Sequence, residues 1–169
     1  MSVRRLNHAV LYVRDVDRSV TFYQEALGFR MVMSMPGAAF LQAPASQNDH
    51  DLGLFQIGPQ ATASQAGRAT VGLYHLAWEV ETLADLQQTA AKLTELDALV
   101  GASDHSTTKA LYAKDPDGLE FEVSWLVPAH LLTDDTLAGR SQIRPLDIQQ
   151  EITRYGADTP GGIGISVPA

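Results

Sequence analysis

Two stretches of the chain repeat one order of secondary-structure signals. In residues 6–57 an apolar strand-like run is followed by a helical segment and three further strand-like runs, and residues 73–125 repeat that order. Aligned strand for strand, the copies place His8 opposite His75. Each βαβββ unit leaves one sheet face uncovered, so two units bury together what neither buries alone. The repeat therefore predicts an α+β fold, with two βαβββ modules forming a curved, partly open mixed sheet around a cleft and helices outside.

Local signals mark the ends of both expected helices. Asp15 and Asp17 are candidate N-caps for a helix that runs to Leu27, and Gly28 stands where a C-cap glycine belongs. In the second copy, Thr82 and the aspartate three residues later form a capping-box pattern ahead of another amphipathic segment. These signals predict one helix in each module.

The modules are expected at about residues 4–58 and 71–127, within one domain that spans residues 1–127. The stretch between them, residues 58–70, is rich in Gly, Pro, Ser and Ala and suits a linker. Residues 128–169 contain one helical candidate, at residues 145–155, and a Gly- and Pro-rich end. We expect this C-terminal segment to be a surface arm and a frayed tail.

Charge and composition narrow the classes of partner. The formal net charge is −8, and 12 Lys and Arg are scattered along the chain, which argues against nucleic acid because phosphate binding needs clustered positive charge. No stretch approaches the apolar length of a membrane span, so we expect a cytoplasmic protein with no membrane partner. The chain has no cysteine, so a metal site must use histidine and carboxylate ligands.

Three side chains of those types are expected to meet on one metal ion. His8 and His75 lie in corresponding first strands, and pseudo-symmetry would bring their imidazoles together in the cleft. In the last strand of the second module, alternation sends Glu120 and Glu122 to one face, and we favour Glu122 as the ligand. Two imidazoles and one carboxylate leave adjacent metal positions open, as in non-haem Fe(II) oxygenases.

Several short motifs together resemble one known superfamily. They are Leu6-Asn7-His8-Ala9-Val10, Phe22-Tyr23, His50-Asp51 before Leu52-Gly53-Leu54-Phe55, Tyr74-His75-Leu76-Ala77, Asp104-His105, and Leu111-Tyr112 running through Asp115-Pro116-Asp117-Gly118 to Glu122. In these positions the chain is similar to the vicinal oxygen chelate superfamily, which contains glyoxalase I, extradiol catechol dioxygenases, epimerases and antibiotic-resistance proteins. The resemblance covers about residues 4–127. Within the superfamily, the spacing from Tyr112 to Glu122 is most similar to that of the extradiol dioxygenases.

The resemblance implies a site and a reaction. His8, His75 and Glu122 would hold one divalent metal, for which Fe(II) is the first expectation and Mn(II) or another first-row metal the alternative. Tyr112 and His50 would be catalytic, although a shift of one residue would put Asp51 in the place of His50. His105 and Asp51 would contact a small aromatic substrate of catechol type, cleaved next to its diol by dioxygen. A homodimer and a monomer are equally consistent with the resemblance.

Other members of the superfamily supply rival functions. Glyoxalase I uses a fourth protein ligand from the last strand of the first module, and here that position falls at Gly53 or Leu54, neither of which binds metal. A lyase or epimerase on the same metal scaffold, or a non-catalytic binding protein of the antibiotic-resistance type, remains as an alternative.

Overall fold

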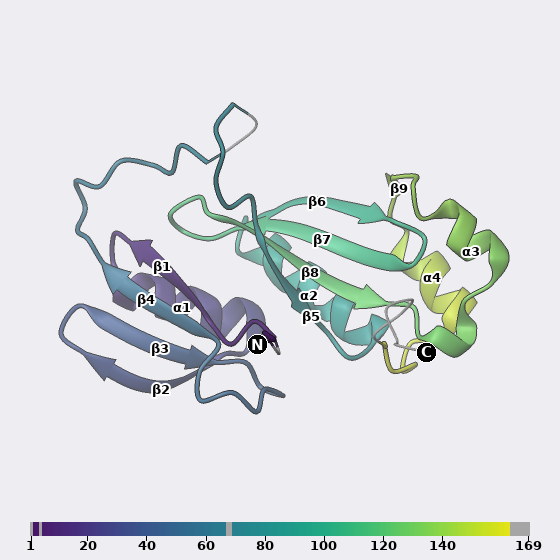
Figure 1. The fold of residues 1–169 in the computed structure, drawn as a ribbon, viewed down its shortest axis with the longest axis horizontal. Helices are drawn as coiled ribbons and strands as arrows, with labels where there is room; N and C mark the ends of the chain where they lie inside the picture. The colour runs from purple at the N-terminus through teal and green to yellow at the C-terminus, as the bar shows by residue number, and fades with distance from the viewer. Residues whose placement is uncertain (1, 4, 67–68, 163–169) are drawn as a thin grey trace. The chain divides into compact units, whose positions relative to one another are not determined.

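The computed structural model describes residues 2–3, 5–66 and 69–162. The chain divides into two compact units. Unit 1 comprises Met1–Gln65 with Asp115–Leu119, and unit 2 comprises Ala66–Lys114 with Glu120–Ala169. The α+β class and the two βαβββ modules are confirmed, because each unit contains one open mixed sheet flanked by helices (Figure 1).

Unit 1 is the first module. Its elements are β1 (Ala9–Val13), α1 (Val16–Leu27), β2 (Arg30–Met35), β3 (Ala38–Gln42) and β4 (Leu52–Gln56). The strand order is β1-β4-β3-β2, with β1 parallel to β4 and the other pairs antiparallel. The expected caps of α1 are confirmed: the Asp15 side chain accepts from the Arg18 amide, and Gly28 ends the helix in the left-handed conformation.

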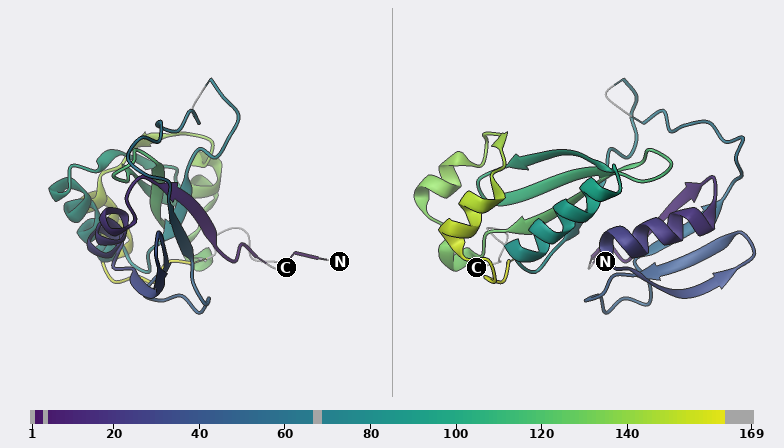
Figure 2. Two further views of the ribbon diagram at one scale, coloured as in Figure 1. Left: turned by 90° about the vertical axis from the view of Figure 1, so that its left-hand side faces the viewer. Right: turned by 180° about the vertical axis from the view of Figure 1, so that it is seen from behind.

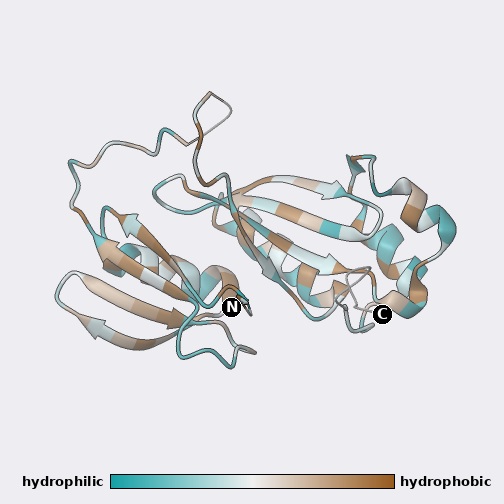
Figure 3. Cartoon of the chain, viewed as in Figure 1, coloured by the Kyte–Doolittle hydropathy of each residue, from teal (hydrophilic) through white to brown (hydrophobic). Residues whose placement is uncertain are grey.

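Helix α1 covers only one face of this sheet, as the view from behind in Figure 2 shows. The covered face carries Leu11, Leu41, Leu52 and Leu54, which are 8% exposed or less. The other face stays open and apolar, and Figure 3 shows hydrophobic residues along its strands. Its exposed members include Val10, Tyr12, Met33 and Phe55. An open apolar sheet face is a surface on which a ligand or another protein segment can lie.

The turn of Asp115–Leu119 is held in unit 1 by the start of α1. The Arg14 amide and guanidinium donate to the Asp117 carboxylate at 2.9 and 2.8 Å, and the Arg18 guanidinium donates at 2.7 Å. The Asp117 side chain is only 6% exposed, whereas the Arg14 and Arg18 side chains are 27% and 49% exposed, so the carboxylate is shielded from water and its partners are only partly so. Tyr23 also donates its hydroxyl to Asp115 at 3.3 Å. Burial first, and then the Asp115 carboxylate, raise the pKa of Tyr23 well above its usual value.

Unit 2 repeats the first module's order. Its strands and helix are β5 (Leu76–Glu79), α2 (Leu83–Glu95), β6 (Leu99–Asp104), β7 (Thr108–Lys114) and β8 (Glu120–Leu126). Strand β5 pairs parallel with β8, as β1 does with β4, and the sheet order is β5-β8-β7-β6-β9. The predicted capping box is confirmed, because Thr82 and Asp85 each accept from the other's backbone amide. Both histidines expected in first strands, His8 and His75, lie one residue before them.

The C-terminal segment corrects the expectation of a surface arm. It contains η1 (Ala129–Leu131), α3 (Asp134–Gly139), β9 (Arg144–Pro145) and α4 (Ile148–Tyr155). Strand β9 pairs with β6, α4 packs against α2, and the Trp125 indole donates to the Thr159 carbonyl at 3.2 Å. The segment therefore packs against the rest of the unit, while the expected frayed tail, residues 163–169, lies outside the described residues. No helix in the described part of the chain has the length and apolarity to cross a membrane.

We expect Asp117→Asn to lower the free energy of unfolding by about 2 kcal/mol, because two arginines lose a shielded carboxylate. Urea denaturation measures the change. The matched variant Asp17→Asn removes an exposed carboxylate from the first turn of α1 and should cost about 0.5 kcal/mol or less. Equal losses in the two variants would show that the Asp117 contacts contribute nothing specific.

Candidate active site

Four of the predicted site residues lie together on the open face of the sheet in unit 2. The His75 Nε2 atom is 3.3 Å from the Glu122 Oε2 atom, and Tyr112 stands directly opposite Glu122 in the ladder of β7 and β8. The His105 Nε2 atom and the Tyr112 hydroxyl are hydrogen-bonded at 2.9 Å. Residues 75, 105, 112 and 122, far apart in sequence, thus form one continuous polar cluster.

The strand register distinguishes the two candidate glutamates. Phe121 and Val123 are 2% exposed or less and face the core, so Glu120 and Glu122 both face the open side. Glu122 lies opposite Tyr112, whereas Glu120 lies opposite Lys114 at the far end of the ladder. Only Glu122 has His75 within ion-pair distance among the described contacts.

The two nitrogens of His75 have different surroundings. Its Nε2 atom faces Glu122, while its Nδ1 atom is buried without a hydrogen-bond partner among the described residues. In His8, by contrast, the Nδ1 atom lies 2.7 Å from the Asn7 side-chain oxygen.

The pair of His75 and Glu122 fits a metal ion. Two ligand atoms bound at right angles to one ion at about 2.1 Å lie about 3 Å apart. The 3.3 Å between Nε2 and Oε2 is close to that separation. Imidazole and carboxylate also suit first-row divalent metals chemically. Across the described residues, this site included, no group of three or more His, Cys, Asp or Glu side chains that could hold a metal ion is gathered.

Tyr112 is a protonated hydrogen-bond donor over the whole neutral range. Burial is the largest cause, and the Glu122 carboxylate the next, of the shift that raises the pKa of Tyr112 to about 12. The phenol can therefore give a hydrogen bond to a ligand oxygen without losing its own proton near pH 7. His105 fixes the position of that hydroxyl from the other side.

The remaining predicted residues lie in unit 1. The rings of His8 and His50 are 4.5 Å apart, and His50 packs edge-on against Phe40 at 5.1 Å. Phe40 in turn contacts Phe55 on the open apolar face. Sequence reasoning missed Asn7 and Phe40, although Asn7 was visible as the neighbour of a candidate ligand.

Asp51 has a different set of contacts from His50. One of its carboxylate oxygens accepts from the Ala43 amide at 2.8 Å, and the other accepts from Ser46 Oγ at 2.8 Å and from Asn48 Nδ2 at 2.6 Å. The side chain is buried, and its three donors all belong to the loop between β3 and β4. These contacts make Asp51 the anchor of the loop that carries His50.

The ladders also identify the position equivalent to Glu122 in unit 1. Glu122 pairs with Ala77 across the parallel ladder of β5 and β8, and Ala77 is the second residue after His75. The second residue after His8 is Val10, which pairs with Gly53. Of the two positions left open by the sequence, Gly53 is therefore the equivalent one, and it offers no metal ligand.

A family model matches most of the chain. The model of the Glyoxalase/Bleomycin resistance protein/Dioxygenase superfamily matches residues 5–123. The chain belongs to this superfamily.

Curated members of the superfamily are similar in sequence. A catechol-2,3-dioxygenase of Bacillus subtilis (strain 168) is 30% identical over 118 residues, covering 70% of this chain and 40% of that protein. A biphenyl-2,3-diol 1,2-dioxygenase 3 of Rhodococcus globerulus is 32% identical over 116 residues, covering 68% of this chain and 59% of that protein. The chain thus spans less than two thirds of the length of these relatives.

Solved structures share the fold at lower identity. A glyoxylase/bleomycin resistance protein/dioxygenase domain from Frankia sp. EAN1pec has a TM-score of 0.58 at 22% identity, covering 73% of this chain and 98% of that one. A lactoylglutathione lyase from Agrobacterium tumefaciens has a TM-score of 0.55 at 20% identity, covering 73% and 95% of the two chains. These likenesses show the fold alone, because one scaffold hosts several chemistries.

We expect Asp51→Asn to loosen the loop between β3 and β4, since the Ala43 amide loses its carboxylate acceptor. Hydrogen exchange of that amide should become about 10-fold faster or more. The neighbouring variant Asp49→Asn changes a side chain that is 97% exposed and should leave the exchange rate unaltered. If both variants leave it unaltered, Asp51 is not the anchor of the loop.

Proposed function

We propose that this protein is a metal-dependent dioxygenase that cleaves a catechol-type ring next to its diol. His8, His75 and Glu122 would hold one divalent metal, Fe(II) first and Mn(II) or another first-row metal as the alternative. The observation that carries the proposal is the cluster in unit 2, where a histidine–glutamate pair spaced for a metal lies beside a phenol with a raised pKa. Similarity to two ring-diol dioxygenases at 30% and 32% identity agrees with it.

The number of protein ligands favours a dioxygenase over a glyoxalase. An oxygenase metal must bind a chelating substrate and dioxygen together, so three protein ligands on one face serve it better than four. Glycine at position 53, the equivalent of Glu122, supplies no fourth ligand. The lyase and binding-protein alternatives therefore stay second.

When bound, the metal would supply Lewis acidity and adjacent positions for substrate and dioxygen. The protein side chains would then orient the substrate and handle its protons. Tyr112 would donate a hydrogen bond to a substrate oxygen and orient the diol. His105 would hold the phenol in place.

In unit 1, His50 rather than Asp51 is proposed as the acid/base group. Its ring lies against that of His8, whereas both oxygens of Asp51 are engaged by loop donors. An imidazole takes up and releases a proton near neutral pH, as ring cleavage requires. The apolar surface that continues from His50 through Phe40 to Phe55 suits an aromatic substrate better than a polar one.

Metal analysis tests the ligand set. After anaerobic loading with Fe(II), the wild-type chain should bind one metal ion, and Glu122→Gln should weaken binding about 100-fold or more because a charged ligand is lost. Glu120→Gln is the matched control and should bind as the wild type does. Loss of metal in the Glu120 variant alone would move the ligand to Glu120.

Oxygen uptake tests the reaction. The Fe(II) form should consume dioxygen with a substituted catechol and give a coloured ring-opened product. Tyr112→Phe should lower kcat about 100-fold while the metal content stays the same, since the phenol is a donor and not a ligand. A methylglyoxal–glutathione assay runs beside it. Turnover there, with no oxygen uptake across a catechol panel, would refute the dioxygenase and support the lyase.

A further inference from the structure

A buried lysine lies on the covered side of the sheet in unit 2, behind the cluster of His105 and Tyr112. Lys109 is 0% exposed, and alternation along β7 puts it on the face opposite to Tyr112. Its ammonium donates to Asp104 on the neighbouring strand and lies 3.0 Å from Glu151 of α4. One buried cation therefore joins β6, β7 and the C-terminal helix.

The same C-terminal segment holds the turn between β6 and β7 by two further contacts. The Ser106 hydroxyl donates to the Thr136 carbonyl of α3 at 2.8 Å. A Cβ built on Gly139 of α3 would lie 2.8 Å from that hydroxyl, so only glycine lets α3 approach so closely. Ser106 itself has a φ of 67°, a conformation that a serine does not keep without support.

His105 lies in this supported turn. Its amide donates to the Thr108 carbonyl at 2.9 Å, and Asp104, which accepts from Lys109, also accepts from the Ser106 amide at 2.7 Å. The backbone on both sides of His105 is thus fixed from the covered face. Its imidazole bonds Tyr112 on the open face.

We propose that Lys109 and Glu151 are positioning residues that tie the turn of His105 to α4 and so keep His105 on the Tyr112 hydroxyl. This rests on the proposed function, in which Tyr112 contacts the substrate. The family model ends at residue 123, so α3 and α4 lie outside the region that it matches.

The charges of Lys109 and its two carboxylate partners explain why the turn of His105 and α4 are held together strongly. A buried ammonium is strongly disfavoured unless its charge is paired, and here two carboxylates share it. Moving α4 away would separate these charges in a water-poor interior. The turn and the helix are therefore expected to move together or not at all.

A double-mutant cycle on kcat tests the coupling. Glu151→Gln should lower kcat about 10-fold with KM within about two-fold of the wild type, because a displaced His105 misplaces the phenol. In a His105→Gln background the same change should have no further effect on kcat. An equal loss in both backgrounds would show that Glu151 does not act through His105 and would overturn the proposal.

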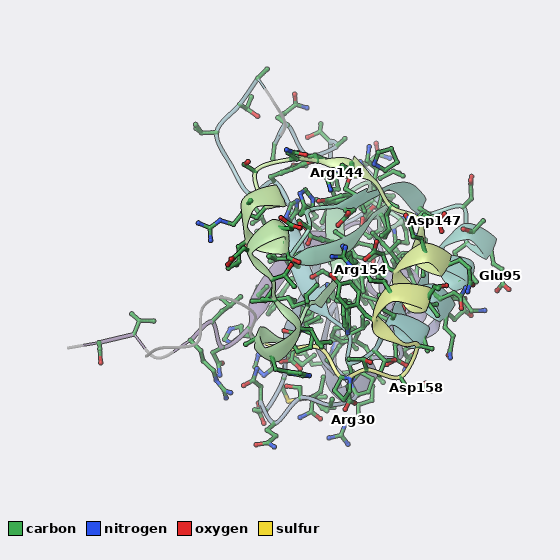
Figure 4. All side chains as sticks on the ribbon, turned by 90° about the vertical axis from the view of Figure 1, so that its right-hand side faces the viewer. Arg30, Glu95, Arg144, Asp147, Arg154 and Asp158 are labelled. Carbon is green, nitrogen blue, oxygen red and sulfur yellow. The ribbon has the colours of Figure 1, made fainter. Side chains whose placement is uncertain are left out.

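The control is Asp158→Asn, which removes an exposed carboxylate from the loop after α4 (Figure 4) and should leave kcat unchanged. Ser106→Ala provides a second route, since it cuts the contact with α3 without changing any charge. It should lower kcat in the same way as Glu151→Gln, and it takes that variant's place if Glu151→Gln fails to fold. A full effect of Asp158→Asn would contradict the proposal.

Histidine side-chain NMR separates this proposal from the proposed function. In the metal-free wild type, ring-nitrogen shifts of His105, assigned with His105→Gln, should report one fixed tautomer. Glu151→Gln or Ser106→Ala should give averaged shifts, and Asp158→Asn should not. Averaged His105 shifts in these variants would support the link between the turn and α4 even if the protein proves inactive on catechols. Only the proposed dioxygenase function would then be refuted. Unchanged shifts in both Glu151→Gln and Ser106→Ala would overturn the tie whatever the activity.

Discussion

The parallel pairing of the first and last strand in each module is the constraint on which the candidate site depends. Parallel strands bring a residue just before one strand beside a residue within the other, however distant they are in sequence. In unit 2 this pairing of β5 with β8 sets His75 against Glu122. In unit 1 the pairing of β1 with β4 sets the surroundings of His8 in the same way, with Gly53 at the equivalent of Glu122. The same parallel strand pairing in the two modules thus gives a histidine–glutamate pair in unit 2 and a histidine without that glutamate in unit 1.

Periodicity and capping residues predicted most of this architecture from sequence. The caps at Asp15, Gly28 and Thr82 are local, so a window of a few residues contains all the information that determines them. Strand starts were less accurate, because the first strands begin after His8 and His75 and not before them. Where a strand begins depends on its hydrogen bonds to a partner strand that is distant in sequence, and no local window contains those bonds.

Contacts that the residue pattern does not show account for what the sequence left open. The choice between His50 and Asp51 depends on three donors in a loop, and the choice between Gly53 and Leu54 depends on a ladder register. Neither the loop hydrogen bonds nor the ladder register can be seen in the residue pattern. The C-terminal segment was misjudged for the same reason: α4 is short and polar, and it is stabilised by α2 and by the charge of Lys109.

The buried lysine is better explained by the position that it gives to its neighbours than by the stability that it adds. Well-packed apolar residues often stabilise a protein as much as a buried ion pair does, so stability alone would not require Lys109 to be charged. Apolar packing is tolerant of small rotations, whereas an ammonium that is hydrogen-bonded to Asp104 and ion-paired with Glu151 loses much of its energy when one partner shifts. The turn that holds the His105 imidazole on the Tyr112 hydroxyl therefore gains more from the charged contact than from apolar packing. The location of that contact on the covered face also leaves the open face free for a ligand.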